Sequence, residues 1–243
     1  MMSGKVDDAD HPQRRVALKA LNQFDGTLSN RVYLTLKNAI LTLEYRPGEI
    51  LRKQQVCDDL RVSRSPVSEA VARLAAEGLV TILPQTGTYV SRFSMTDIRE
   101  SAFLREALEL AAVEFLAPVI TEDQIIQLRR NMRVQKALIE DSDFPGFYEK
   151  DAEMHMLLMS FTGFPRLAKM AETVWLQVDR ARRVILPVPG RIQATLEEHE
   201  AIVAALEAHD PIAAKAATRQ HLRQLLTFLE PLEEARPDLF LQS

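Results

Sequence analysis

The sequence predicts a mainly α-helical protein that combines a small N-terminal unit, which contains one β-hairpin, with a C-terminal all-α helical bundle. Apolar residues recur at helical spacing along most of the 243 residues, and only 8 glycines interrupt the chain. After Gly78 the apolar period changes from about 3.6 residues to about 2, which is typical of a change from helix to strand. No apolar run reaches the roughly 20 residues of a membrane span, and we expect no membrane association.

The N-terminal unit is expected over residues 29–93, after a polar tail formed by residues 1–28 whose composition is typical of flexible segments. Ser29 is positioned to cap a first helix, and Arg46-Pro47-Gly48 would end it. A short second helix is expected over residues 53–60.

A third helix is expected over residues 64–77, because Ser63 or Ser65 can cap its start and Gly78 can stop its end. Two β-rich runs follow, and residues 84–87 (Pro-Gln-Thr-Gly) form the turn between them. Three short helices followed directly by a hairpin predict a winged helix-turn-helix, a fold that places its recognition helix in the major groove of DNA.

The segment 51–92 resembles the GntR family of bacterial regulators, whose signature is V-S-R-x-P-V-x-x-A-x-x-x-L-x-x-x-G-L-V followed by a wing. The residues that carry the resemblance are Val62, Ser63, Arg64, Pro66, Val67, Ala70, Leu74, Gly78, Leu79 and Val80. It implies a cytoplasmic transcription regulator that binds double-stranded operator DNA as a homodimer. The chain departs from the family at Ser68, where arginine is usual, at Thr86, where a basic residue is frequent, and at Arg61, where glycine is common.

Seven residues on or near the third helix and the wing are candidate DNA contacts, because they offer positive charge, hydroxyl groups or close backbone approach. They are Arg52, Lys53, Ser63, Arg64, Ser65, Ser68 and Gly87. Arg64 can pair with a guanine through two guanidinium nitrogens, and Gly87 lets the wing approach the DNA backbone. Val67, Val71 and Leu74 form the opposite helix face, which we expect in the core.

The charge distribution agrees with a polyanion partner for the first unit only. Residues 29–93 carry 9 Lys and Arg against 6 Asp and Glu, whereas residues 94–243 carry 17 against 24. A basic segment joined to an acidic one favours nucleic-acid binding by the basic part. The single cysteine, Cys57, excludes an internal disulfide framework and fits a reducing compartment.

The C-terminal bundle is expected over residues 96–230, and residues 231–243 are expected to form a loosely docked tail. Prolines, glycines and short polar segments divide the bundle into six amphipathic helices. Their expected ranges are 96–117, 121–140, 145–162, 165–186, 191–208 and 211–229.

Four side chains of the bundle have the types and the spacing of a metal site. Asp151 and His155 lie four residues apart and share one helix face, while His199 and His221 belong to the fifth and sixth helices. A carboxylate and three imidazoles from three helices can converge on one divalent cation. Spacing alone leaves a second interpretation open, in which these histidines are ordinary packed or surface residues.

These residues resemble the metal-binding effector domains of the FadR-type branch, in their six-helix, VanR-like form. Asp151 and His155 match its Asp-x3-His motif, Glu198-His199 its Glu-His pair, and His221-Leu222 its His-Leu pair. The resemblance implies a divalent metal ion, and three imidazoles with one carboxylate favour zinc or nickel.

Arg105 occupies the R-x3-E position of that family, together with Glu109. The resemblance implies that Arg105 clamps the carboxylate of a small organic-acid effector. The alternative is a surface salt bridge to Glu109, which would contribute little. Arg182 and Arg183 are weaker candidates for the same role.

Taken together, the motifs predict a regulator, in this family a repressor, whose operator binding responds to a carboxylate metabolite at the metal site. One alternative is a metal sensor in which the ion itself is the signal. A more remote alternative is a metal-dependent hydrolase, but the sequence has no HExxH motif, nucleophile elbow or Gly-rich phosphate loop. We therefore predict no catalytic residue and no enzyme activity.

Overall fold

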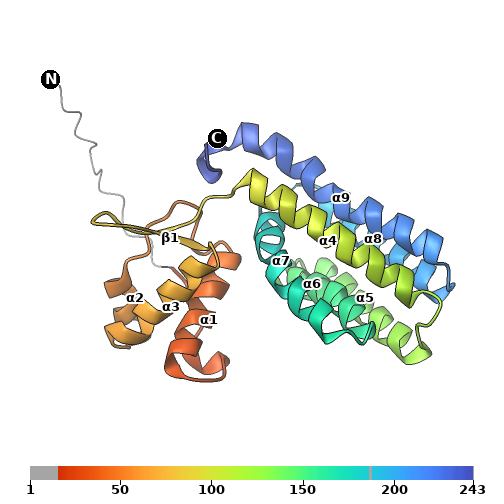
Figure 1. Ribbon diagram of the computed structural model, residues 1–243, viewed down its shortest axis with the longest axis horizontal. Helices are drawn as coiled ribbons and strands as arrows, with labels where there is room; N and C mark the ends of the chain where they lie inside the picture. Colours follow the sequence, from red (N-terminus) through yellow and green to blue (C-terminus); the bar gives the residue numbers. More distant parts are fainter. Residues whose placement is uncertain (1–15, 186–187, 243) are drawn as a thin grey trace.

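The computed structural model describes residues 16–185 and 188–242, and it confirms the expected fold class. Figure 1 shows a winged unit in red to yellow beside a helical bundle in yellow-green to blue. Positions 1–15 of the predicted tail lie outside the described residues. Position 186, the last residue of the helix predicted over 165–186, also lies outside them. No helix of the described part is long and apolar enough to cross a membrane.

The winged unit contains three helices and a two-stranded wing. They are α1 (Leu28–Leu41), α2 (Lys53–Leu60), α3 (Arg64–Ala76), β1 (Val80–Leu83) and β2 (Gly87–Val90). The strands are antiparallel, with Val80 opposite Val90 and Leu83 opposite Gly87. Apolar side chains of the helices and both strands form one buried core, which fixes the orientation of α3 relative to the wing.

Two features at the start of this unit differ from the prediction. The cap of α1 is Thr27 rather than Ser29, because the Thr27 hydroxyl accepts a hydrogen bond from the Asn30 backbone N–H at 3.3 Å. Residues 16–27 were expected in the flexible tail, but Val16 is only 6% exposed and packs into the core of the winged unit. Leu18 and Leu21 of the same segment also pack against this core, so several apolar contacts hold the segment in place.

The bundle contains six helices among the described residues. They are α4 (Met95–Leu116), α5 (Glu122–Glu140), α6 (Phe144–Phe161), α7 (Pro165–Ile185), α8 (Arg191–Glu207) and α9 (Pro211–Ala235). Helix α4 packs against α7 and α9, while α8 packs against α5 and α9 (Figure 1). The bundle therefore has an interior lined by several helices, as a ligand site between helices requires.

The C-terminus is docked more firmly than predicted. Helix α9 continues through Pro231 to Ala235, and a short turn at Pro237–Leu239 follows. The Phe93 N–H donates to the Leu239 carbonyl at 2.9 Å, and the Phe240 ring is 2% exposed at 5.6 Å from the Phe93 ring. The expected loose tail thus packs, through Leu239 and Phe240, on the segment that links the wing to α4.

Candidate functional site

The candidate recognition helix α3 exposes the polar residues that the sequence indicated. Ser63 is its N-cap residue but makes no side-chain capping bond, and Ser63, Ser65 and Ser68 are exposed. On the opposite face Val67, Val71 and Leu74 are fully buried, as expected. Hydroxyls at the start of this helix are therefore available to DNA, together with the backbone N–H groups of its first turn.

Arg64 is exposed at the start of α3 and is oriented by α2. Its Nε and Nη2 atoms donate to Gln54 Oε1 at 3.2 and 2.9 Å, and Gln54 donates to Asp58 Oδ1 at 3.0 Å. This chain of bonds places the Arg64 guanidinium beside the start of α2, where Lys53 is the first residue and Arg52 precedes it. The structure therefore brings three of the predicted cations to one end of the helix pair.

The wing supplies the last predicted DNA contact. Gly87 has a φ of 144°, which a residue with a Cβ rarely adopts, and it begins β2 directly after the exposed turn residues 84–86. Arg61, in the turn before α3, also has a left-handed conformation with a φ of 54°. This explains why glycine is common there, because a non-glycine residue is strained in that region.

The three predicted metal-ligating histidines meet in the interior of the bundle. His155 comes from α6, His199 from α8 and His221 from α9, and all three are at most 5% exposed. The Nε2 atom of His221 lies 3.2 Å from that of His155 and 3.3 Å from that of His199. Two imidazole nitrogens bound to one ion, each about 2.0–2.1 Å from it, lie about 3 Å apart, so these separations fit a shared metal.

Each histidine has an acceptor at its other ring nitrogen. His155 Nδ1 lies 2.7 Å from Glu109 Oε2, and His221 Nδ1 lies 2.7 Å from Glu198 Oε2. His199 Nδ1 lies 3.0 Å from Gln135 Oε1. Acceptors at Nδ1 fix the proton there, so all three Nε2 atoms present lone pairs to the common centre.

The orientation of the Gln135 amide follows from its neighbours. Its nitrogen donates to Asn131 Oδ1 at 2.7 Å and approaches the Lys150 carbonyl at 3.4 Å, and a carbonyl can only accept. The amide oxygen must therefore face His199. Three lone pairs directed at one point repel each other in a buried site, and a cation at that point would relieve the repulsion.

Asp151, the fourth predicted ligand, lies beside this cluster, whereas the donor atoms that all lie within 4.8 Å of one another are those of the three histidines. Asp151 is fully buried on α6, and its Oδ1 lies 3.3 Å from His199 Nε2. Its carboxylate forms an ion pair with Arg182 of α7. Among the described residues neither carboxylate oxygen accepts a well-formed hydrogen bond, which leaves lone pairs for a cation. The three imidazoles, with the Asp151 carboxylate next to one of them, therefore fit zinc or another first-row divalent ion.

The electrostatics of the cluster favour neutral imidazoles. Burial lowers the pKa of His155, and it lowers the pKa of His199 and His221 well below the usual value, with the neighbouring histidines adding to the effect. Burial alone would raise the pKa of Glu109, but its contacts with His155 and Arg105 lower the pKa by a larger amount. The Glu109 carboxyl is therefore ionised. Neutral histidines are the form that binds a metal.

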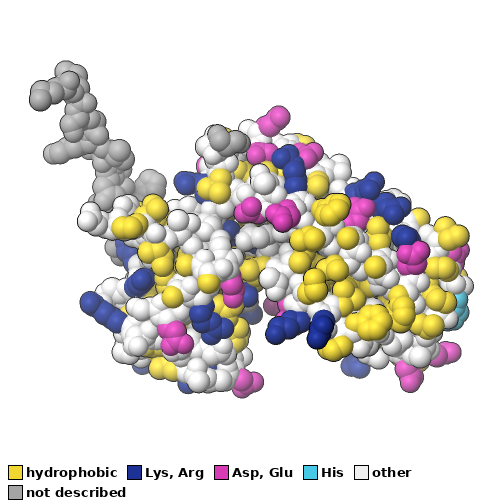
Figure 2. Space-filling model, in the orientation of Figure 1, with side chains coloured by type: hydrophobic (Ala, Val, Ile, Leu, Met, Phe, Trp, Pro, Cys, Tyr) yellow, Lys and Arg dark blue, Asp and Glu magenta, His cyan; other side chains and the backbone are white. Residues whose placement is uncertain are grey.

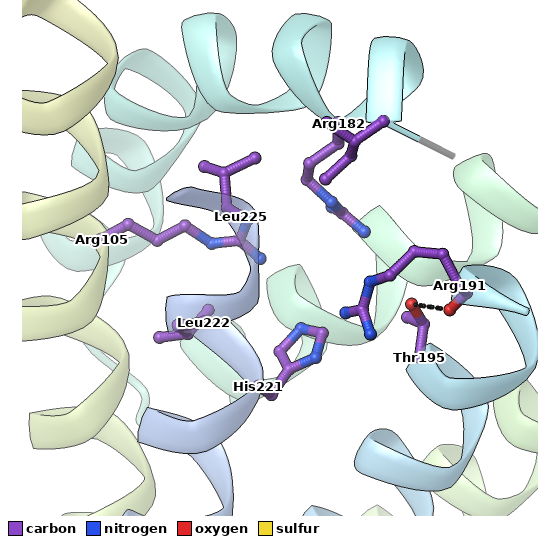
Figure 3. Close-up of a pocket in the computed structure, with 8 residues that line it drawn as sticks. Arg105, Arg182, Arg191, Thr195, His221, Leu222 and Leu225 are labelled. Atoms are coloured by element: carbon purple, nitrogen blue, oxygen red, sulfur yellow. Dashed lines mark hydrogen bonds between the residues drawn. The ribbon is translucent and has the colours of Figure 1, made fainter. Parts of the chain in front are cut away.

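A pocket lies next to His221 and is lined by three arginines (Figure 3). Its arginines are Arg105, Arg182 and Arg191, and the pocket is small, with about 30 Å³ open to the centres of water-sized molecules. In Figure 3 the Arg182 and Arg191 side chains extend toward the same space near His221. Such a lining suits a small anion.

The Arg105–Glu109 salt bridge is buried rather than at the surface, and the role of Arg105 as an effector clamp stays a prediction. The Arg105 Nε donates to Glu109 Oε1 at 2.6 Å, and Arg105 is 4% exposed. Arg105 also lines the pocket beside His221. Of the weaker candidates, Arg182 lines the same pocket, whereas Arg183 lies outside it. His209 also lies outside the cluster, and its Nδ1 faces the Ala117 carbonyl at 2.8 Å.

Several site residues were missed by the sequence analysis. Gln135 and Arg191 belong to no sequence motif. Glu109 and Glu198 were named only as members of motifs, and the structure shows that they face His155 and His221. Glu198 accepts two hydrogen bonds from Arg191, at 2.7 and 2.8 Å, in addition to facing His221. Glu198 faces His221, and the neighbouring His199 enters the same cluster, so two adjacent residues of α8 contribute to the site.

Helix α7 connects this site with the winged unit. Arg180 is fully buried, its Nη2 donates to the Ser91 carbonyl, and its guanidinium lies 4.6 Å from the centre of the Phe93 ring. Two residues further along α7, Arg182 pairs with Asp151. Helix α7 therefore contacts both Asp151, beside the histidine cluster, and the segment that follows the wing.

Comparison with known proteins gives matches over both units. Residues 28–90 match the bacterial regulatory proteins of the gntR family, and residues 100–224 match the FCD domain. The chain is 32% identical over 213 residues to the HTH-type transcriptional repressor RspR of Escherichia coli, which covers 88% of this chain and 93% of RspR.

Solved structures have the same arrangement. Escherichia coli McbR superposes with a TM-score of 0.74 at 20% identity, covering 86% of this chain and 99% of McbR. A GntR-type regulator from Rhodococcus sp. RHA1 superposes with a TM-score of 0.73 at 25% identity. The match covers 82% of this chain and 97% of the Rhodococcus chain.

The fold, the exposed recognition helix and these matches define a DNA-binding transcription regulator rather than an enzyme. The particular family follows from the two domain matches and the extended similarity to RspR. The chain belongs to the GntR family and carries a C-terminal FCD domain.

Proposed function

We propose that the protein is a repressor whose operator binding is controlled by a small carboxylate, which binds beside a divalent metal ion, zinc or nickel, in the helical bundle. Asp151, His155, His199 and His221 are the proposed ligands. The observation that carries the proposal is the convergence of three Nε2 atoms, with neighbouring pairs at 3.2 and 3.3 Å, while each Nδ1 faces an acceptor. Repression is inferred from the name of the relative RspR.

The pocket arginines support an anionic effector. Arg182 now pairs with Asp151, whose carboxylate is also a proposed metal ligand. Once Asp151 is engaged by a cation, its charge is shared, and the Arg182 guanidinium can pair with an incoming carboxylate instead. An ion acting alone as the signal would leave the partly open pocket beside His221 without a ligand, so we favour the organic acid over the pure metal sensor.

Helix α7 is the proposed route from the effector to DNA. If Arg182 paired with an effector, α7 would lose its ion pair with Asp151. Arg180 on the same helix donates to the Ser91 carbonyl, directly after the wing. The two contacts lie within one turn of a rigid helix, so a displacement at one end would be felt at the other. The effector would thereby change the position of the wing and of α3.

We further propose that two copies associate through α4. Its outer face carries Phe103, Ala107, Ala111 and Phe115 at a constant spacing of four residues, and Phe103 is 73% exposed. The order Phe-Ala-Ala-Phe reads the same in both directions, so two antiparallel α4 helices can place alanines at the crossing and phenylalanines at both ends. Phe115 contacts Phe164, the residue before α7, at 5.1 Å between ring centres, which extends the apolar face. Figure 2 shows hydrophobic side chains gathered on the surface of the bundle.

Metal analysis tests the proposal. Full-length protein purified with zinc or nickel supplied should retain about one equivalent of metal per chain, and His199→Ala should lose it. His209→Ala is the matched control, because His209 lies outside the cluster. Absence of metal from the wild-type protein, or equal retention by His199→Ala, would contradict the metal site.

A further inference from the structure

A second, larger pocket lies between the winged unit and the helical bundle. It is lined by Thr42 and Leu43 at the end of α1, by residues of α5 and α6, and by Arg183 of α7 and Ile192 of α8. Its empty volume is about 1190 Å³, which includes space open to solvent. This pocket shares no lining residue with the one beside His221.

The lining of this inter-domain pocket is mostly apolar. Leu43, Ile139, Phe144 and Ile192 contribute hydrocarbon surface, and Phe144 is 45% exposed although it is a large aromatic residue. Apolar pockets with a few polar groups are typical of small-molecule sites. The apolar lining therefore favours a ligand with a hydrocarbon or aromatic body.

Arg183 is the cationic side chain among the lining residues of this pocket that the structure describes. The Arg183 guanidinium lies 4.9 Å from the centre of the Tyr148 ring, and both residues line the pocket. Within residues 16–185 and 188–242, no carboxylate forms an ion pair with Arg183, and the acid one turn earlier, Asp179, pairs with Arg182 at 3.5 Å. Burial lowers the pKa of Arg183 by more than Tyr148, Asp179 and Glu149 raise it, so its charge is poorly solvated.

We infer that this pocket binds a monocarboxylic acid with an apolar body, whose carboxylate pairs with Arg183 and whose body contacts Leu43, Phe144 and Ile192. The ligand would touch both the end of α1 and the bundle, so its binding would fix the winged unit relative to the bundle. This site is separate from the metal site and does not depend on the proposed function. It would give the regulator a second input at the joint between its two units.

Isothermal titration of the full-length protein with 4-phenylbutyrate and with octanoate tests the inference and separates aromatic from aliphatic bodies. At least one acid should bind saturably with one site per chain. Arg183→Gln should weaken that binding tenfold or more, because a charge-assisted pair is lost. Ile192→Trp should abolish it by filling the pocket, whereas Arg183→Lys should retain part of it. Thermal melting of each variant verifies that it is folded.

Two controls keep this site distinct from the metal site. Arg166→Gln removes an exposed arginine elsewhere on α7 and should leave the affinity unchanged, and so should His199→Ala. Three results would overturn the inference: no saturable binding of either acid, equal affinity in a folded Arg183→Gln protein, or binding that disappears in His199→Ala. The last result would assign the acid to the metal site instead.

Discussion

Replacing Glu109 by glutamine isolates the contribution of one carboxylate that supports both a histidine and an arginine. Glu109 is fully buried, its Oε1 accepts from Arg105 at 2.6 Å, and its Oε2 lies 2.7 Å from His155 Nδ1. Glutamine has the same shape, but one of its two terminal atoms is an NH₂ group. The NH₂ group would then face either the Arg105 Nε–H or the His155 Nδ1–H, and two donors cannot form a hydrogen bond.

The expected effects have two separate magnitudes. The free energy of unfolding should fall by about 3–5 kcal/mol, because Arg105 stays buried after losing its anionic partner. Metal affinity should fall about 10–100-fold, the usual effect of removing the partner that orients a ligating histidine. The first loss should persist in metal-free protein, since it concerns the ion pair and not the metal.

Urea denaturation of the metal-free protein measures the first effect, and competition with a fluorescent zinc chelator measures the second. Glu106→Gln is the matched control, since Glu106 lies on the same helix and pairs near the surface with Arg223 at 2.9 Å. Its loss should cost less than about 1 kcal/mol. If Glu109→Gln unfolds like Glu106→Gln and keeps wild-type metal affinity, the supporting role of Glu109 is refuted.

Three further predictions concern DNA, assembly and pH. Arg64→Ala should weaken specific operator binding by about 1–3 kcal/mol in fluorescence anisotropy at fixed salt, and an unchanged affinity would exclude base reading by Arg64. The wild-type protein should be a dimer in light scattering, as proposed, and Phe103→Glu should be a monomer. Ile212→Glu, which alters another exposed apolar residue, should stay dimeric, and a dimeric Phe103→Glu protein would exclude the α4 interface. Burial holds the pKa of His199 and His221 well below 6.5, so the unfolded chain takes up protons that the folded chain excludes. The melting temperature of metal-free protein should therefore decline as pH falls below about 6.5, and a constant value between about pH 5 and 6.5 would contradict neutral buried histidines.

The sequence predicted most helix boundaries because prolines, glycines and caps mark them. Asp210-Pro211 begins α9 as expected, since the Asp210 side chain accepts from two backbone N–H groups and Pro211 needs no partner there. The end of α9 was predicted too early because Pro231 normally interrupts a helix. Here the helix continues past it, and Phe240 beyond it is buried on Phe93.

The sequence predicted the proposed metal ligands and the pocket residues Arg105 and Arg182, but not the residues that support them. Asp151 and His155 share a face by their spacing, which sequence shows directly. Gln135 and Arg191 act through partners on other helices, and no periodicity or local motif records such contacts. The inter-domain pocket was equally hidden, because it exists only where the end of α1 meets the bundle.

Operator binding measured with and without metal and organic acid tests the central claim most directly. DNA fragments selected by the full-length protein from a random pool provide the operator, and a panel of small carboxylic acids provides the effector. The account predicts that one acid changes operator affinity of the metal-loaded wild-type protein at least tenfold, and that His199→Ala binds the same DNA without responding. A response that persists undiminished in His199→Ala, or one produced fully by metal without any acid, would contradict it.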